Sequence, residues 1–234
     1  MSSKPPRAPI INAPPLLAAL VIVFLIAHGV RAYGGDSINL QMLYHGAVYP
    51  ERFWGTLGMG DMIAGVNSAP AYNGPIPLVF SLFATAFLHG DWLHVVLNSA
   101  VFVAAGKPVY EGFSQGRGGG ATLFLSLFFL SVGAGSLLYL AGNYPDGPIA
   151  IGASGGVSGI IAAVLLMQGR KSGGPPARIL SAPFLRVSAA FIIGNLILWV
   201  AGPAILGMNI AWQAHIGGYI MGAVFYRWVC LARG

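Results

Sequence analysis

Gly152-Ala153-Ser154-Gly155 begins one apolar segment of the chain, and Ala214-His215-Ile216-Gly217-Gly218 lies inside another further along. Each segment has the length and apolar character of a membrane-buried helix. Polar and ionisable side chains are costly in hydrocarbon, so those that do occur there are functional candidates. The pair therefore predicts a serine nucleophile and its histidine base working inside a membrane.

The overall composition supports a membrane location. Of the 234 residues, 56% are hydrophobic and 8% are charged, whereas a soluble domain carries roughly 25% charged residues. A single cysteine, Cys230, excludes an intrachain disulfide. The isoelectric point near 9.7 would suit a nucleic-acid-binding protein. The basic residues form no dense stripe, however, and lie between apolar segments, so we expect no nucleic-acid partner.

The apolar runs predict an all-α fold, a single domain over residues 1–234 built as a bundle of six transmembrane helices. The runs lie at about 13–30, 90–106, 121–141, 150–168, 185–201 and 207–230. The run at 76–88 is expected to form a short interfacial helix that leads into the second span. The first run, after a short tail at 1–12, could be a secretory signal peptide. Five more runs follow it, which favours a retained first span.

The charges predict that both termini lie in the cytoplasm, because an excess of Lys and Arg marks cytoplasmic segments. In this orientation the basic residues divide into an inner set, Lys4, Arg7, Lys107, Arg117, Arg170, Lys171, Arg178, Arg186, Arg227 and Arg233, and an outer set, Arg31 and Arg52. The acidic residues Asp36, Glu51, Asp61, Asp91 and Asp146 are then outside, and Glu111 is inside. We expect an integral multi-pass protein of a bacterial inner membrane.

The first outer loop, about 31–76, is long and rich in aromatic residues. These residues are Tyr33, Tyr44, Tyr49, Phe53, Trp54 and Tyr72. Such residues suit the membrane–water interface. They either anchor the protein there or shape the access of a substrate from the outer leaflet.

Four polar residues from three predicted helices fall in one layer of the bundle. His94 and Asn98 lie early in the second span, Ser154 early in the fourth and His215 in the outer half of the sixth. At 1.5 Å per residue their depth below the outer surface is roughly 5–13 Å. His94 and Asn98 are spaced i, i+4 and therefore share one helix face.

Glycine pairs predict that the fourth and sixth helices pack closely. The pairs Gly152/Gly156, Gly155/Gly159 and Gly218/Gly222 have the spacing that lets membrane helices approach each other. We therefore expect His215 to come within hydrogen-bonding reach of Ser154.

These residue types match acyl-transfer chemistry. A serine hydroxyl needs a base to take its proton, and His215 is the candidate base for Ser154. The oxyanion formed on the substrate needs preorganised donors, for which His94, Asn98 and the backbone N–H of Ser154 are candidates. With no acidic residue expected beside His215, the arrangement is a dyad.

Each feature also has a purely structural interpretation. The Gly-x-Ser-Gly pattern can serve tight helix packing, and His94 with Asn98 can form an interhelical hydrogen bond. Ser158 forms a second such pattern one turn deeper, where we expect it to pack or to bond back to its own helix. Asn195, in the fifth helix, is expected to make an interhelical hydrogen bond rather than to act in a gate. His28 and His45 are expected to be solvated or interfacial.

The combination resembles the rhomboid intramembrane serine proteases over nearly the whole chain. The stretch Phe87–Asn98 is similar to the family's H-x4-H-x3-N signature, and the segments around Ser154 and His215 are similar to its nucleophile and histidine motifs. The resemblance implies an endopeptidase that cuts transmembrane segments of other proteins near their outer end, with the bilayer as its environment. We expect no metal or organic cofactor, because the histidines have no Cys or carboxylate partners at the expected membrane depth. The resemblance implies that Ser154 and His215 are catalytic and that His94 and Asn98 stabilise the oxyanion. Supporting roles fall to His89, Gly152, Gly155, Gly218 and Gly222.

The chain departs from the family pattern at two places. Phe80 and Ser81 stand where many members have Trp-Arg, the usual anchor of the first loop. Ser158 stands where a large aromatic residue often packs against the histidine, so the orientation of His215 is expected to come from helix packing or another aromatic such as Trp212.

Two other classes of protein compete with a protease. A catalytically silent rhomboid-like binder of membrane proteins would not need Ser154 together with His215. A small transporter or channel usually shows ionisable residues along a pathway or paired broken helices, neither of which is evident.

The fifth helix is the expected gate for lateral substrate entry. It covers Val187–Val200 and is expected to end at Gly202-Pro203, which leaves its outer end poorly fixed. The following loop, Ala204–Trp212, is then expected to cap the site.

Overall fold

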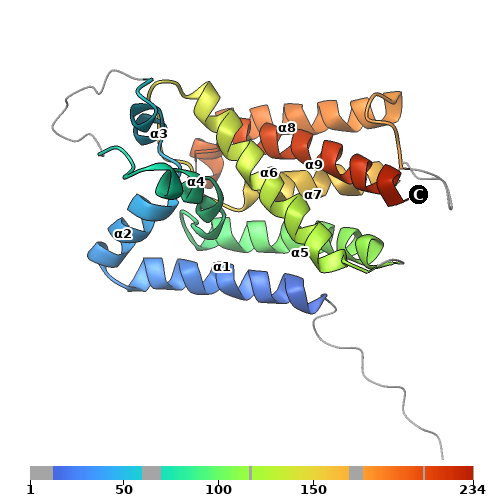
Figure 1. The fold of residues 1–234 in the computed structure, drawn as a ribbon, viewed down its shortest axis with the longest axis horizontal. Coiled ribbons are helices and arrows are strands. Elements are labelled where there is room, and N and C mark those ends of the chain that lie inside the picture. The colour runs from blue at the N-terminus through green and yellow to red at the C-terminus, as the bar shows by residue number, and fades with distance from the viewer. Residues whose placement is uncertain (1–12, 60–69, 116–117, 169–175, 208, 234) are drawn as a thin grey trace, which may run out of the picture.

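The protein is a helical bundle, seen in a computed structural model that describes residues 13–59, 70–115, 118–168, 176–207 and 209–233 (Figure 1). The helices are α1 (Pro15–Tyr33), α2 (Asp36–Gly46), α3 (Pro50–Thr56), α4 (Pro75–Ala84), the 3-10 helix η1 (Thr85–Phe87), α5 (Trp92–Ser114), α6 (Gly120–Gly142), α7 (Ser154–Gln168), α8 (Ala182–Leu206) and α9 (Trp212–Arg233). Within the described residues the only β-pairing is an isolated bridge between Val48 and Ala150. The all-α prediction is confirmed.

The six long helices follow the six apolar runs of the sequence. Four of them, α1, α5, α6 and most of α8, are long and apolar enough to cross a membrane. Helix α7 is apolar but has 15 residues, and α9 carries Gln213, His215, Arg227 and Arg233 among its apolar residues. The described part of the chain therefore contains four candidate membrane spans.

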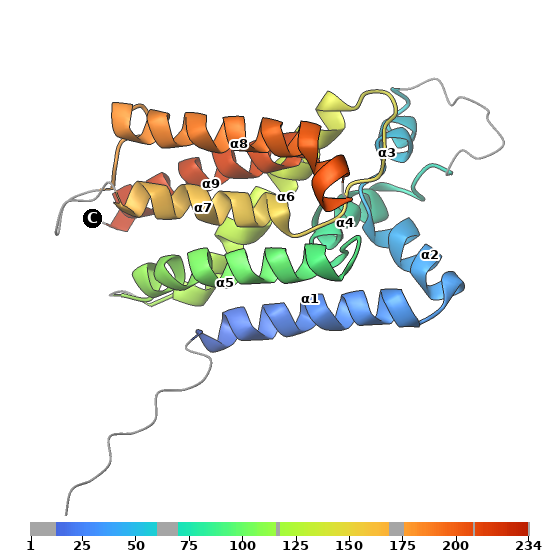
Figure 2. The same cartoon turned by 180° about the vertical axis from the view of Figure 1, so that it is seen from behind.

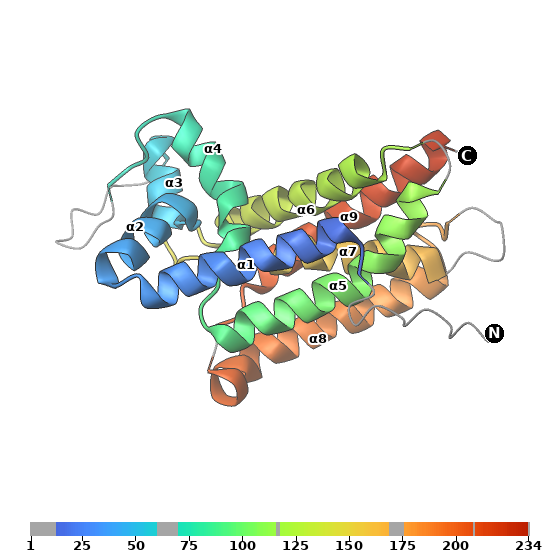
Figure 3. The same ribbon diagram turned by 90° about the horizontal axis from the view of Figure 1, so that it is seen from below.

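Helices α6, α7 and α9 form the centre of the bundle. Helix α1 packs beside α5, and α8 lies at the margin (Figure 2). The most apolar window of α6 is 56% buried, whereas that of α8 is 11% buried, so most of α8 faces outward. The start of α1 and the end of α9 lie at the same end of the bundle, opposite α2, α3 and α4 (Figure 3).

Several residues used in the topology prediction lie outside the described residues. They are the tail 1–12 with Lys4 and Arg7, together with Asp61, Arg117, Arg170 and Lys171. The expected interfacial helix at 76–88 corresponds to α4 and η1. Residues 88–91 separate η1 from α5.

The segment between α1 and α4 contains two helices, α2 and α3, that were not predicted from the sequence. A buried arginine, Arg52, holds this segment together. The side chain of Arg52 is 3% exposed. Its Nε donates to the carbonyl oxygen of Pro70 at 2.7 Å and its Nη1 donates to that of Tyr44. The guanidinium lies over the rings of Tyr44 and Tyr72, 3.9 and 4.0 Å from their centroids. Two of the aromatic residues expected at an interface therefore enclose a cation.

The expected end of the fifth helix at Gly202-Pro203 is wrong. Helix α8 continues to Leu206 with Pro203 inside it, and Gly207 terminates it with a left-handed φ of 65°. Proline removes one backbone hydrogen bond but its φ is compatible with a helix. The connection to α9 is therefore shorter than expected, from Gly207 to Ala211.

Candidate active site

The chain before α7 is held in an extended path by its neighbours. Val48 and Ala150 exchange backbone hydrogen bonds of 3.1 and 2.9 Å. Thr85 uses its hydroxyl to donate to the Ala150 carbonyl at 2.7 Å and its own carbonyl to accept the Gly152 N–H at 2.9 Å. The segment that delivers Ser154 is therefore fixed to η1 and to the region between α2 and α3.

Ser154 is the first residue of α7 and is half-buried. The first N–H groups of a helix have no partner inside the helix, so the backbone around Ser154 offers free donors. Ser158, one turn later, is buried and donates its hydroxyl hydrogen to the Ser154 carbonyl at 2.7 Å. The prediction that Ser158 bonds back to its own helix is confirmed.

His94 and Asn98 present two donors to the same point in front of α7. Asp91 caps α5 by accepting the His94 N–H at 2.8 Å, and Gly90 donates its N–H to His94 Nδ1 at 3.2 Å. A neutral His94 ring must then carry its proton on Nε2. Asn98 is 7% exposed, and its Nδ2 has no hydrogen-bond partner among the described residues.

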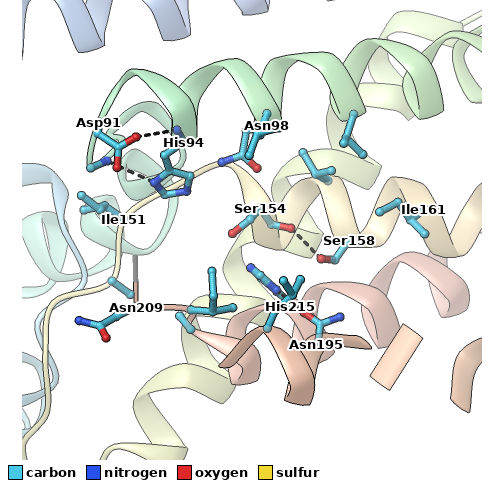
Figure 4. A pocket seen from close by; sticks show the side chains of 18 of the residues that line it. Asp91, His94, Asn98, Ile151, Ser154, Ser158, Ile161, Asn195, Asn209 and His215 are labelled. Atoms are coloured by element: carbon cyan, nitrogen blue, oxygen red, sulfur yellow. Dashed lines mark hydrogen bonds between the residues drawn. The ribbon is translucent and has the colours of Figure 1, made fainter. Parts of the chain in front are cut away.

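Gly152 marks where these donors converge. A Cβ on Gly152 would lie 2.9 Å from His94 Nε2 and 3.7 Å from Asn98 Nδ2, and the φ of Gly152 is +128°. Both the backbone conformation and the space therefore require glycine at this position. Figure 4 shows His94 and Asn98 pointing from α5 toward the start of α7.

His89 supports the residue just before the serine. It is fully buried, and its Nε2 accepts the Ala153 N–H at 3.4 Å. Its carbonyl oxygen accepts a hydrogen bond from His28 Nδ1 at 3.1 Å.

The expectation that His28 is solvated or interfacial is wrong, since its side chain is 2% exposed and packs edge-on against Trp92. His28 is enclosed where α1 contacts α5 and η1, and its ring nitrogen is hydrogen-bonded to the His89 carbonyl. His45 is exposed, as expected.

Glycine contacts bring α9 against α7. A Cβ on Gly218 would lie 2.0 Å from the Gly155 carbonyl oxygen, and one on Gly222 would lie 2.3 Å from Gly159 Cα. The close approach predicted from Gly155/Gly159 and Gly218/Gly222 is therefore present, whereas Gly152 faces α5 and Gly156 faces α6. This close approach places His215, one turn before Gly218, beside the start of α7.

The four residues predicted to be catalytic or to stabilise the oxyanion line one cavity of about 580 Å³, whereas the predicted supporting residues His89, Gly152, Gly155, Gly218 and Gly222 do not line it. The polar lining includes His94, Asn98, Ser154, Asn195 and His215, among apolar side chains of α5, α7 and α8. Ser154 and His215 face this common space without a direct hydrogen bond between them (Figure 4). An apolar cavity with a few convergent polar groups is the usual form of a small ligand or substrate site. Within the described residues no group of three His, Cys, Asp or Glu side chains is placed to hold a metal ion.

The interhelical hydrogen bond predicted for Asn195 is confirmed, but its partner, His215, was not predicted. Nδ1 of His215 is hydrogen-bonded to Oδ1 of Asn195 on α8. Trp212, the aromatic residue considered for this purpose, instead lies 6.3 Å from the ring of Trp199. The signal in the sequence was Asn195 itself, the one amide side chain of α8.

The described residues bring a serine, a histidine and unpaired hydrogen-bond donors into one cavity of a membrane protein. This is the combination of nucleophile, base and oxyanion donors that the sequence predicted. The rhomboid domain model matches residues 78–233, which covers every residue of this site. The chain therefore belongs to the rhomboid family. The comparison with curated proteins gave no match.

Proposed function

We propose that this protein is an intramembrane serine endopeptidase that cleaves transmembrane segments of other membrane proteins near their outer end. The observation that carries the proposal is the convergence of Ser154, His215 and the free donors of His94 and Asn98 on one cavity. In the proposed topology all six long helices cross the membrane, both termini are cytoplasmic, and the membrane is a bacterial inner membrane.

In the first half of the reaction, Ser154 forms an ester with the substrate. Its hydroxyl oxygen attacks the carbonyl carbon of the scissile peptide while His215 Nε2 takes the hydroxyl proton. The carbonyl oxygen becomes an oxyanion. Collapse of the tetrahedral intermediate breaks the C–N bond, and the leaving amine takes the proton from His215.

In the second half, water replaces the amine. His215 takes a proton from the water as it attacks the ester, and the proton returns to Ser154 Oγ when the ester bond breaks. The product is a free carboxyl group and the restored hydroxyl.

The oxyanion is formed twice and is bound in front of α7. His94 Nε2–H, Asn98 Nδ2 and the backbone N–H of Ser154 surround the space next to Gly152. Donors that are already in place lose no free energy in reorganising as the charge forms. This is the role that we assign to His94 and Asn98.

The decisive test is cleavage of a model transmembrane substrate in liposomes by wild-type protein and by Ser154→Ala and Ser158→Ala. Ser154→Ala is expected to abolish cleavage and fluorophosphonate labelling. Ser158→Ala, the matched serine whose hydroxyl is already bonded within the helix, is expected to retain both. A folded wild-type protein that binds the substrate without cutting it would establish the alternative, a silent binder of membrane-protein clients.

A further inference from the structure

One hydrogen bond of the proposed base is not used by the reaction described above. Oδ1 of Asn195, in the middle of α8, is bonded to Nδ1 of His215 on α9. Asn195 is 6% exposed and lies on the cavity wall. Because its side chain is enclosed, its two polar ends must be satisfied by the protein.

A second hydrogen bond fixes which end of the amide faces His215. Nδ2 of Asn195 donates to the carbonyl oxygen of Phe191 at 2.9 Å. A carbonyl can only accept, so the NH₂ group must point at Phe191 and Oδ1 must point at the ring. Oδ1 likewise only accepts, so Nδ1 of His215 must be the donor.

The orientation of the amide determines the state of the imidazole. A neutral imidazole carries one proton, so a protonated Nδ1 leaves a lone pair on Nε2. Nε2 is the nitrogen that the proposed reaction needs as a base. Figure 4 shows Asn195 on one side of His215 and Ser154 on the other.

We propose that Asn195 is a positioning residue that holds neutral His215 in its Nδ1–H tautomer and fixes the ring plane, with Nε2 toward Ser154. This inference rests on the proposed function of the site. Asn195 takes the place of the carboxylate in a serine–histidine–aspartate triad. An amide performs this orientation without a charge, which suits a site in hydrocarbon where an ionised carboxylate is costly.

The chain offers a matched control for the loss of a contact between α8 and α9. Ser188, two turns before Asn195, shares a buried hydrogen bond of 2.8 Å with the hydroxyl of Tyr219. This bond joins the same two helices and does not involve His215. Ser188→Ala therefore removes a bond of the same kind without changing the base.

The kinetic experiment compares Asn195→Leu, Asn195→Asp and Ser188→Ala on the model transmembrane substrate. Asn195→Leu has the same number of side-chain heavy atoms and removes the acceptor, and its kcat is expected to fall about 10–100-fold, by analogy with residues that orient metal-binding histidines. Its KM should stay near the wild-type value. Asn195→Asp keeps an acceptor and should recover at least part of the loss, while Ser188→Ala should leave kcat within about twofold. An equal loss in Ser188→Ala and Asn195→Leu would overturn the inference.

Nitrogen NMR of protein labelled with ¹⁵N-histidine gives a readout that does not require turnover. His215 should show a protonated Nδ1 and an unprotonated Nε2 in the wild type and in Ser188→Ala. Asn195→Leu should move it toward a mixture of tautomers. An unchanged tautomer and unchanged kcat in Asn195→Leu would refute the role of Asn195 in an active enzyme. A wild type without cleavage or fluorophosphonate labelling would instead refute the proposed function.

Discussion

Gly218 of α9 packs against Gly155 of α7 so closely that a Cβ on Gly218 would lie 2.0 Å from the Gly155 carbonyl oxygen. Two backbones in direct contact leave no freedom to adjust, because neither has a flexible side chain that can move away. This contact sets the separation of the helices that carry Ser154 and His215. The geometry of the site therefore depends on a position that has no side chain.

We expect Gly218→Ala to lower both stability and activity. Overpacking at a close contact costs about 1–3 kcal/mol, and more where only backbone can move. The measurement is thermal unfolding in detergent together with turnover of the model substrate. The control is Gly194→Ala on α8, where a Cβ would meet nothing within 4 Å. Equal stability and turnover in the two variants would show that the contact of α7 with α9 does not limit the site.

Removal of the amide of Asn98 tests the proposed oxyanion site. Its Nδ2 is buried without a partner in the described structure, so its expected partner is the charge that forms on the substrate. Loss of one such donor lowers kcat about 10²–10³-fold. We expect Asn98→Ala to show this loss with little change in KM, because the bond forms in the transition state.

The neighbouring residue provides the control for Asn98. Ser99 is also buried on α5 and also lacks a hydrogen-bond partner among the described residues, but it does not line the cavity. Ser99→Ala should keep turnover near the wild-type value. An Asn98→Ala protein with undiminished kcat would remove Asn98 from the proposed oxyanion site.

The meeting of the four site residues in one cavity was predictable, whereas their direct hydrogen-bond partners were not. A constant rise per residue fixes the layer in which Ser154, His215, His94 and Asn98 lie, and glycine spacing indicates which helices meet. The bond between Asn195 and His215 depends on the rotation of α8 about its axis. That rotation is weakly encoded, because apolar residues predominate around α8 and most of the helix faces outward.

Two predictions from local sequence were wrong or incomplete, one about the end of a helix and one about a group of aromatic residues. Pro203 predicted the end of a helix, yet α8 continues for three more residues. The aromatic residues of the first outer loop predicted an interface. That Tyr44 and Tyr72 enclose Arg52 could not be read from spacing, because it requires the path of the chain between α2 and α4.

Arg52 is expected to be the main anchor of that region. Its two hydrogen bonds to carbonyl oxygens and its two close ring contacts cannot all be made by lysine, which lacks the planar fork. We expect Arg52→Lys to destabilise the protein by about 2–4 kcal/mol, from the lost charged hydrogen bonds and cation–π contacts. Thermal unfolding and limited proteolysis between α2 and α4 measure this. Arg186→Lys, at an exposed position of α8, is the control and should behave as wild type.

Helix α8 is the expected gate for substrates that enter from the bilayer. A substrate helix satisfies its backbone hydrogen bonds internally, so it must enter sideways and unwind before Ser154 reaches a carbonyl. The cavity lies between α5 and α8, with Leu97 and Leu198 on its two sides. The weak burial of α8 allows it to move away from α5.

A reversible cross-link between α5 and α8 tests this route. In a Cys230→Ser background, cysteines at Leu97 and Leu198 are joined by a thiol-cleavable reagent. We expect cleavage of a transmembrane substrate to stop and to return after reduction, because a substrate helix cannot pass between α5 and α8 while they are joined. Fluorophosphonate labelling of Ser154 should continue in the cross-linked protein, since a small reagent needs no lateral opening, and the two single-cysteine variants should remain active after the same treatment. Full cleavage by the cross-linked protein would show that the substrate enters between other helices.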